Sequence, residues 1–287
     1  MKMVNSFLPN GDMSDAQFQT IARLAHEEAG LIFRANKAPL VRARLARRMR
    51  ALKITDFGDY FAFVTSAEGL DERRRMISSL TTNVSNFFRE SHHFDLLRSD
   101  ILPSLLDRAR AGQRVRLWSA GCSDGQEAYS IAMTLADMEP DFGQLDIRIL
   151  ASDIDPDVIR RGRAGIYPTT ILPDVPELYQ KAFLMPVGDG HENSVQVDPT
   201  LRELVTFREL NLLQDWPMKG KFDVIFCRNV VIYFDGASQD MLWQRFCSVT
   251  ADGGWLVVGH SEHLSDIART DFRATGRTVY RRPEPQY

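Results

Sequence analysis

Hydrophobic positions in the first hundred residues recur with the spacing of helices. Ser14 and Gln17 have the spacing of a capping box, which predicts a helix that begins there and ends at Gly30. The next predicted helix carries a single apolar stripe, made of Val41, Leu45, Met49 and Leu52. Further helical runs are predicted over 57–65, 71–80 and 90–110, the last interrupted near Pro103. The pattern therefore predicts a small all-α N-terminal domain over 1–88, followed by a linker helix over 89–112.

Beyond Gly112 the pattern changes to short apolar runs that alternate with helical stretches. Strands are predicted over 115–120, 147–152, 222–226, 254–258 and 278–281. Helices are predicted over 126–138, 156–163 and 239–249. This order is typical of a parallel sheet with right-handed crossovers, so we expect a Rossmann-like α/β domain over 113–287. The proline-rich range 166–207, with a β-like run at 194–197, is too long for a loop and predicts a small inserted β-subdomain.

Composition agrees with a globular protein, since 44% of the 287 residues are hydrophobic and 25% are charged. Intrinsic disorder and collagen are excluded. The chain lacks the roughly 18 to 20 consecutive apolar residues of a membrane span and the features of a signal peptide, so we expect a soluble, cytoplasmic protein. Its cysteines are three in number, far apart and not in CxxC spacing, which favours reduced thiols over disulfides or a structural zinc site.

Charge is distributed unevenly along the chain. The formal net charge is -3, yet residues 34–53 hold eight basic residues and no acidic one, which leaves a net charge of -11 for the rest. We expect this helix to dock an acidic protein partner through Arg42, Arg44, Arg47, Arg48 and Arg50. A solvated helix face, and binding to nucleic acid or an anionic membrane, are the alternatives.

Candidate ligand-binding residues follow the predicted strands, where α/β sheets bind ligands. Gly121 lets the chain turn sharply and approach a ligand, although an ordinary tight turn would also require it. Asp153 suits a ribose diol or a helix cap, whereas Asp155 is assigned mainly to capping. Other strand ends contribute Asn211 and Leu212, suited to an adenine edge, and Arg228 and Asn229. Because the GxGxxG pattern is absent, the set predicts a pocket for an adenosine compound without a polyphosphate.

Six blocks in order along nearly the whole chain carry a resemblance to a known family. They are TTNVSNFFRE (81–90), LWSAGCSDGQEAYS (117–130), ASDID (151–155), AGIY (164–167), FCRNVVIYF (226–234) and GHSE (259–262). Together these blocks resemble the bacterial chemoreceptor glutamate methyltransferases, the CheR family. One departure is DGQEA at 124–128, where the family usually has TGEEP, and it bears on the role of Glu127.

The resemblance implies an S-adenosylmethionine-dependent protein-glutamate O-methyltransferase that releases S-adenosylhomocysteine. The cofactor-binding residues that it implies are Asn83, Ser85, Arg89, Gly121, Glu127, Asp153, Asn211, Leu212, Arg228 and Asn229. The catalytic residues that it implies, nearest the transferred methyl group, are Arg89 and Tyr233. The partner that it implies is the cytoplasmic helical domain of a chemoreceptor. A C-terminal receptor peptide could also add as a strand to the β-subdomain.

Several alternatives were weighed against this interpretation. A nucleic-acid or small-molecule methyltransferase on the same fold is disfavoured because residues 227–230 read CRNV and lack the Asn/Asp-Pro-Pro-aromatic pattern of base methylation. Retention of Arg89 and Tyr233 disfavours a non-catalytic module that senses the cofactor. The histidines of HSEH at 260–263 do not have a typical zinc spacing, and His92 and His93 suit a structural or capping role. We therefore expect a monomer without metal, nucleic-acid partner or membrane insertion.

Overall fold

The computed structural model describes residues 12–81, 85–188, 193–265 and 271–284. Its internal contacts divide the chain into two units. The first comprises Met1–Thr82 and Tyr233–Asp235, and the second comprises Asn83–Ile232 and Gly236–Tyr287. No helix of the described ranges is long and apolar enough to span a lipid bilayer. The three cysteines are free thiols.

The first unit is helical over its described residues, as its apolar periodicity predicts. Its helices are α1 (Asp15–Ala29), η1 (Ala35–Lys37), α2 (Ala38–Leu52), α3 (Phe57–Thr65) and α4 (Leu70–Leu80). The predicted capping box is confirmed, since Gln17 N donates to Ser14 Oγ at 3.2 Å and Ser14 N donates to Gln17 Oε1 at 2.8 Å. Gly30 ends α1 in the left-handed conformation with φ of 65°, which glycine adopts without strain.

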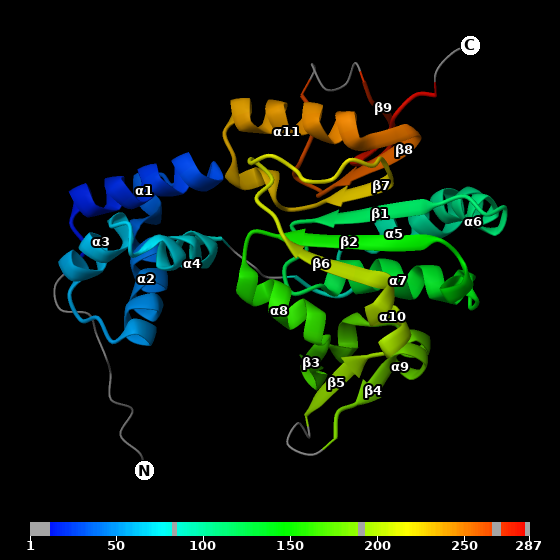
Figure 1. The fold of residues 1–287 in the computed structure, drawn as a ribbon, viewed down its shortest axis with the longest axis horizontal. Coiled ribbons are helices and arrows are strands. Elements are labelled where there is room, and N and C mark those ends of the chain that lie inside the picture. The colour runs from blue at the N-terminus through cyan, green and yellow to red at the C-terminus, as the bar shows by residue number, and fades with distance from the viewer. Residues whose placement is uncertain (1–11, 82–84, 189–192, 266–270, 285–287) are drawn as a thin grey trace. The chain divides into compact units, whose positions relative to one another are not determined.

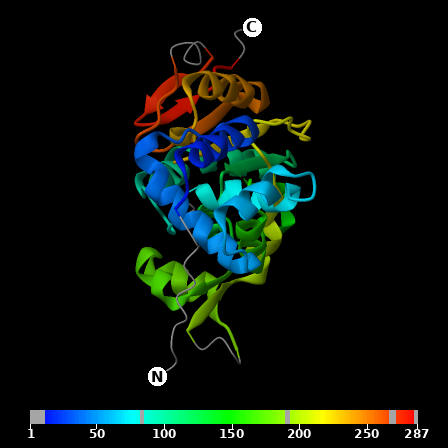
Figure 2. The same cartoon turned by 90° about the vertical axis from the view of Figure 1, so that its left-hand side faces the viewer.

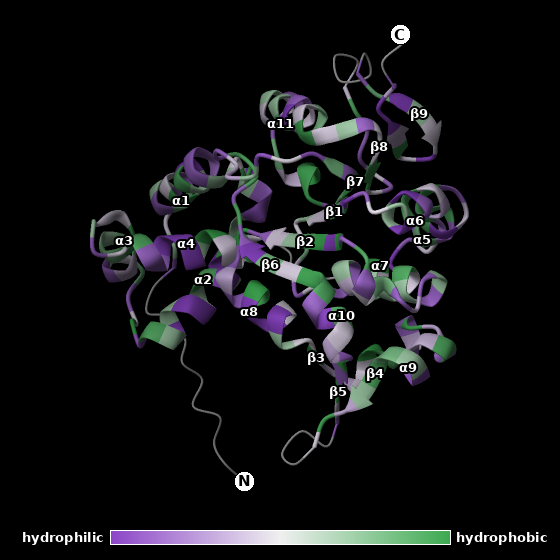
Figure 3. Ribbon diagram, turned by 45° about the vertical axis from the view of Figure 1, so that its right-hand side comes forward, coloured by the Kyte–Doolittle hydropathy of each residue, from purple (hydrophilic) through white to green (hydrophobic). Residues whose placement is uncertain are grey.

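Helix α2 shows how a strongly basic sequence forms a stable helix. Val41, Leu45 and Met49 are fully buried, so three of the four predicted stripe positions lie in the core. Leu52 is 38% exposed, because the helix ends at this residue. The mixed purple and green of α2 in Figure 3 reflects this one apolar stripe on an otherwise polar helix.

A short segment from far along the chain completes the first unit. Leu31 forms an isolated antiparallel bridge with Phe234, and Ile32 N donates to the carbonyl of Tyr233 at 3.0 Å. His26 Nε2 lies 2.7 Å from Asp235 Oδ2. No periodicity in the sequence predicts this pairing, because an isolated bridge leaves no repeating pattern.

The second unit begins with one continuous helical stretch that changes its winding. It runs through α5 (His92–Leu96), the π-helical η2 (Leu97–Ile101) and α6 (Leu102–Arg110). The predicted interruption near Pro103 takes the form of the π turn that directly precedes it. Proline cannot donate a backbone hydrogen bond, and a local change of winding is one way for a helix to accommodate that loss.

A seven-stranded sheet forms the centre of the second unit, in the order β6-β2-β1-β7-β8-β10-β9. Its strands are β1 (Val115–Ala120), β2 (Ile147–Asp153), β6 (Val205–Glu209), β7 (Phe222–Cys227), β8 (Thr250–Val258), β9 (Arg273–Gly276) and β10 (Val279–Arg281). The first five pair in parallel, and β10 is antiparallel to both β8 and β9. Figure 1 labels β6, β2, β1, β7, β8 and β9 in this order. The predicted Rossmann-like α/β architecture is confirmed.

Helices and a smaller sheet surround these strands. The helices that follow α6 are α7 (Gln126–Met138), α8 (Pro156–Ala164), α9 (Glu177–Phe183), α10 (Pro199–Leu204) and α11 (Gly236–Val249), with the short turns η3 (Phe142–Gln144), η4 (Thr169–Asp174) and η5 (Val231–Tyr233). Strands β3 (Ile166–Pro168), β5 (Ser194–Val197) and β4 (Leu184–Pro186) form an antiparallel sheet in that order. Figures 1 and 2 show this small sheet beyond the β6 end of the large one. The range 166–207 expected for the inserted subdomain also contains α9, α10 and the first residues of β6, which belongs to the large sheet.

Candidate active site at the carboxyl ends of the parallel strands

The turn after β1 needs glycine for two reasons. Gly121 has φ of +80°, and a Cβ atom there would lie only 2.3 Å from Val230 Cγ2. The backbone N–H groups of Gly121 and Cys122 both donate to the carbonyl of Ser152, at 2.8 and 2.9 Å, and so fasten this turn to the end of β2. The close approach to Val230 is a packing constraint that accounts for the glycine, whichever ligand the turn faces.

Asp153 is a buried carboxylate at the end of β2. It is 8% exposed, and its two oxygens accept hydrogen bonds from Ser123 N at 2.8 Å and Asp155 N at 3.0 Å. Burial raises the pKa of Asp153 to about 6, against the effect of these donors. The capping role belongs to Asp155, whose Oδ1 accepts from Asp157 N at 2.7 Å at the start of α8. A carboxylate can accept about four hydrogen bonds, so Asp153 has capacity for a further donor such as a ribose hydroxyl.

Arg228 bridges two carboxylates inside the second unit. Its Nη1 lies 3.1 Å from Glu127 Oε2 and its Nη2 lies 3.3 Å from Glu90 Oε2. Its Nη2 also donates to the carbonyl of Arg89. The guanidinium lies over the ring of Phe94 with its carbon 5.8 Å from the ring centre. Because the side chain of Arg228 is only 2% exposed, its charge depends on these partners.

The network formed by Arg228, Glu90 and Glu127 leaves some of its hydrogen-bonding groups without partners. Arg228 Nε and Glu90 Oε2 are buried and have no hydrogen-bond partner among the described residues. The backbone is left-handed at Phe88, Glu90 and Asn229, with φ of 51°, 57° and 59°. Non-glycine residues in this conformation and unpartnered buried polar atoms both cost free energy, and both are enriched at binding sites. This combination marks the region as a candidate ligand site.

Ionisation differs among the groups of this network. Burial would raise the pKa of Glu90, but His260, Arg228 and His93 outweigh it and lower that pKa to about 2. Burial raises the pKa of Glu127, opposed mainly by Arg228, and Ser119 Oγ donates to Glu127 Oε1 at 2.7 Å. Burial and the charge of Arg228 lower the pKa of His93 to about 3, which keeps the imidazole neutral. Glu90 is therefore the carboxylate most firmly held in its charged form.

Glu262 is a functional candidate that the sequence did not reveal. Its Oε1 accepts from the backbone N–H groups of Val230 and Val231, both at 2.8 Å, and its Oε2 accepts from Asn229 and Gly259, both at 2.7 Å. Burial raises the pKa of Glu262 against the effect of these four donors. The residue is 2% exposed and joins the ends of β7 and β8. Its place in the GHSE block was the available signal, although spacing alone does not indicate this contact.

The loop after β6 is held from two sides. Asn211 Oδ1 accepts from Leu213 N at 3.0 Å, so that this oxygen closes its own turn. The carbonyl of Leu212 accepts from Trp216 Nε1 and from Arg245 Nη1, both at 3.1 Å. The Arg245 guanidinium lies over the Trp216 ring at 4.4 Å. The loop is thus fixed through its backbone.

The remaining predicted site residues lie in different places. Ser85 and Arg89 are half-buried in the second unit, where the carbonyl of Arg89 contacts Arg228. Tyr233 belongs to the first unit. Asn83 lies outside the described residues. The shared role predicted for Arg89 and Tyr233 stays a prediction.

The five arginines of the basic helix are not equivalent. Arg48 pairs with buried Glu72 through two contacts of 3.0 and 2.5 Å, and Arg44 donates to the carbonyls of Leu80 and Thr81 at the end of α4. Arg42 pairs with Asp12. Arg47 and Arg50 are exposed. The local charge count therefore overstates the positive charge of this helix, because acids elsewhere in the unit neutralise part of it.

A parallel sheet with a glycine turn after β1 and an acid at the end of β2 is typical of the nucleoside-binding class of α/β folds. Residues 83–281 match the family model of the CheR methyltransferase SAM binding domain, and residues 16–81 match that of the CheR methyltransferase all-alpha domain. The chain belongs to the CheR methyltransferase family, and its second domain is an S-adenosylmethionine-binding methyltransferase domain.

Named relatives cover nearly the full length of the chain. A probable chemotaxis protein methyltransferase of Rhizobium etli is 46% identical over 258 residues, which are 90% of this chain and 96% of the relative. The chemotaxis protein methyltransferase of Escherichia coli (strain K12) is 42% identical over 272 residues, which are 93% of this chain and 91% of the relative. That of Klebsiella aerogenes is 42% identical over 269 residues, with 93% and 90% covered.

Proposed function

We propose that the protein transfers a methyl group from S-adenosylmethionine to glutamate side chains on the cytoplasmic helical domain of chemoreceptors, forming a methyl ester. The observation that carries this proposal is the match of both parts of the chain to the two CheR family models, together with 40 to 46% identity to several chemotaxis methyltransferases. The reaction belongs to sensory adaptation, and we place the protein in the cytoplasm as a monomer.

The residues present fit this cofactor. Asp153 offers carboxylate lone pairs to ribose hydroxyls, and Glu127 offers a carboxylate to the ammonium of the amino-acid portion. Gly121 leaves the turn between them free of a side chain. The unpartnered Arg228 Nε is a buried donor that a carboxylate could satisfy. Ser85, Arg89, Asn211, Leu212 and Asn229 would complete the pocket, together with Asn83.

The chemistry asks little acid–base work of the protein. When bound, S-adenosylmethionine supplies a methyl group on a positively charged sulfur. A glutamate with an ordinary pKa of about 4.3 is ionised at neutral pH and is already a nucleophile. The chain therefore needs to position the carboxylate in line and remove water from it. We assign this orienting role to Arg89 and Tyr233, since a tighter hold would lower the reactivity of the carboxylate.

The decisive experiment is transfer of a labelled methyl group from S-adenosylmethionine to a purified receptor cytoplasmic fragment. We expect label on the fragment that mild base releases as methanol, which identifies an ester. Label that resists base would indicate methylation of an amine or amide. Absence of transfer, with cofactor binding retained in calorimetry, would contradict the proposed substrate while leaving the cofactor assignment intact.

Receptor recognition is proposed at two places. The exposed arginines Arg47 and Arg50 would attract acidic receptor helices. The edge strands β3 and β4 of the small sheet would accept a C-terminal receptor peptide as an added strand. The hairpin turn predicted near 185–190 for this contact lies partly outside the described residues. A pull-down with receptor C-terminal peptides tests the second contact, and a flat titration would contradict it.

A further inference from the structure

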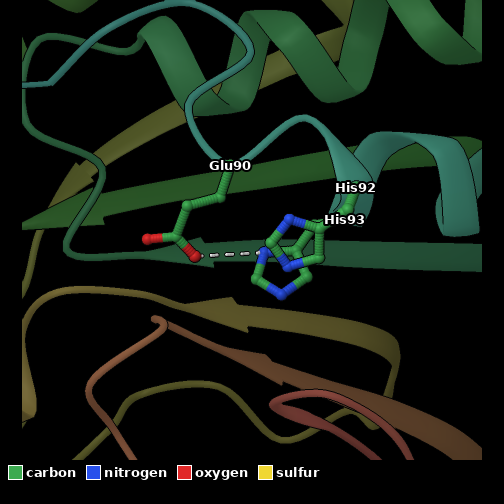
Figure 4. A group of neighbouring side chains, drawn as sticks. All are labelled: Glu90, His92 and His93. Carbon is green, nitrogen blue, oxygen red and sulfur yellow. Dashed lines mark ion pairs between the residues drawn. The ribbon is translucent and has the colours of Figure 1, made fainter.

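Three side chains with metal-binding atoms gather before and within the first turn of α5. One ligand atom from each of Glu90, His92 and His93 lies within 4.8 Å of the other two. Figure 4 shows the Glu90 carboxylate pointing toward the two imidazole rings. His93 is fully buried, Glu90 is half-buried and His92 is exposed, so the cluster reaches the surface on one side.

The hydrogen bond of His93 to Thr278 indicates which ring nitrogen carries the hydrogen. The Thr278 hydroxyl donates to the carbonyl of Arg277 at 2.7 Å. With that hydrogen donated to Arg277, the hydroxyl is placed to accept in its 3.0 Å contact with His93 Nε2, which favours the tautomer with its hydrogen on Nε2. In this tautomer, Nδ1 of the neutral ring holds a lone pair. A histidine that donates through one nitrogen to a fixed neighbour is typical of metal ligands.

The lone pair of His93 faces another acceptor. His93 Nδ1 and Glu90 Oε2 lie 3.5 Å apart, and both are buried with no hydrogen-bond partner among the described residues. Two buried acceptors that face each other are stabilised by a cation or a donor between them, and Arg228 Nη2, 3.3 Å from Glu90 Oε2, serves only the Glu90 side of this pair. Ligands about 2.0 to 2.2 Å from a tetrahedral zinc ion are separated by roughly 3.4 Å. The observed separation therefore fits two ligands of one ion.

The surrounding charge also favours a cation. Arg228 lies 3.3 Å from Glu90 Oε2, but it shares its charge with Glu127 at 3.1 Å. The carboxylates of Glu90 and Glu127 outnumber the guanidinium that they share.

We infer that Glu90, His92 and His93 form a binding site for a divalent transition-metal ion such as zinc, with solvent completing the coordination beside exposed His92. One carboxylate oxygen and two imidazole nitrogens suit zinc, cobalt, nickel or copper better than magnesium or calcium, which prefer oxygen ligands. The sequence-based expectation of no metal rested on the spacing of HSEH and did not consider these residues together.

The test uses tag-free full-length protein stripped with a chelator and titrated with Co²⁺, whose visible absorption reports coordination. We expect one Co²⁺ per chain, displaced by Zn²⁺ and not by Mg²⁺. His92→Ala changes an exposed residue and should weaken Co²⁺ binding by about tenfold or more. His263→Ala, which removes an exposed histidine outside the cluster, is the matched control and should leave affinity within about twofold of the wild type.

Thermal melting of both variants verifies that they fold. Three results would overturn the inference: a wild-type protein that binds no Co²⁺, a His92→Ala protein with wild-type affinity, or an equal loss in the two variants. Calorimetry with S-adenosylmethionine on the same samples is independent of these outcomes. Failure of the metal site would therefore not be confused with failure of the proposed methyltransferase activity.

Discussion

Each unit contains an arginine paired with glutamate, and the two arrangements differ in how completely their hydrogen-bonding groups are paired. In the first unit, Arg48 contacts both oxygens of Glu72, and the buried Tyr60 hydroxyl donates to Glu72 Oε1 at 3.0 Å. In the second unit, Arg228 is divided between two carboxylates and leaves its Nε unpartnered among the described residues. We call the Arg48–Glu72 pair closed, because its carboxylate is fully engaged, and the Arg228 network open, because it leaves buried polar atoms without partners among the described residues.

This difference separates a structural ion pair from a binding site. In the closed pair, both oxygens of Glu72 accept from Arg48 and the contact joins α2 to α4. An open network keeps buried donors and acceptors available, and the left-handed residues beside it store conformational cost that the rest of the fold must support. Buried polar atoms without hydrogen-bond partners therefore indicate a binding site better than the presence of charge alone.

Removing Arg228 should have the largest effect. In Arg228→Met, Glu90 and Glu127 lose their shared cation, and breaking a buried pair typically costs about 3 to 5 kcal/mol. We expect affinity for S-adenosylmethionine to fall about a hundredfold or more, and methyl transfer to be lost. Calorimetry on protein verified as folded by melting measures this. Wild-type affinity in Arg228→Met would show that the open network around Arg228 is not a cofactor site.

Removing Arg48 should affect stability and not cofactor binding. We expect Arg48→Met to lower the free energy of unfolding by about 3 kcal/mol, because Glu72 is left buried without its partner. The double variant Arg48→Met/Glu72→Leu should recover much of this loss, since no unpaired charge remains. Urea unfolding gives the stability, and calorimetry gives the cofactor affinity. A loss of cofactor affinity in folded Arg48→Met would show that the closed pair also serves the site.

The raised pKa of Asp153 predicts a pH dependence. With a pKa of about 6, the carboxylate protonates as the pH falls through that value and loses acceptor capacity for a ribose hydroxyl. Cofactor affinity should therefore fall by up to about tenfold per pH unit below about 6. Titrations from pH 5 to 8 measure this, with Asp153→Asn as the reference that should bind weakly at every pH. If the affinity of wild type and Asp153→Asn for the cofactor changed with pH in the same way, a group other than Asp153 would cause the pH dependence.

The same pKa has a consequence for stability with a definite sign. The unfolded aspartate has a pKa of about 3.9, so between about pH 4 and 6 the folded protein holds a proton that the unfolded chain has released. Ionising Asp153 thus costs stability as the pH rises through this window, and the cost persists above it. Urea unfolding at pH 4.5 and 7 measures this loss in the free energy of unfolding. The loss between the two pH values should be smaller in Asp153→Asn, which has no carboxyl group to ionise at this position.

The smallest effect is expected at the exposed arginines of α2. Arg47→Glu/Arg50→Glu should slow methylation of a receptor fragment about two- to fivefold, more at low salt, while cofactor affinity is unchanged. Arg74→Glu/Arg75→Glu is the matched control, since these arginines are exposed on α4 of the same unit. Equal slowing by both pairs would indicate general charge attraction and no particular docking face.

Much of the fold follows from local patterns in the sequence. The capping box at Ser14, the buried stripe of α2 and strands β1, β2, β7 and β8 all depend on periodicity or on signals within a few residues. Strand β6 was absorbed into the range expected for the β-subdomain because it follows α10 directly, without a turn signal. Short elements of this kind carry too few positions for a period to be visible.

The candidate site was only partly predictable, for a different reason. Strand ends identified Asp153, Gly121 and Arg228, because parallel strands bring their carboxyl ends together. Glu90 and Glu262 depend on contacts across more than thirty residues of sequence and have no local pattern. The pairing of Arg48 with Glu72 was not predicted for the same reason, because Glu72 lies outside the basic range 34–53.

Segment 233–235 delays completion of the first unit during synthesis on the ribosome. Thr82 and Asp235 are separated by about 150 residues, so on the ribosome the helices emerge well before Phe234, which forms the isolated bridge with Leu31. At about 5 to 20 residues per second, this delay is roughly 8 to 30 seconds. Throughout that interval His26 lacks Asp235 and the backbone of Ile32 lacks Tyr233. The N-terminal unit can therefore acquire its full set of contacts only after most of the methyltransferase domain has been translated.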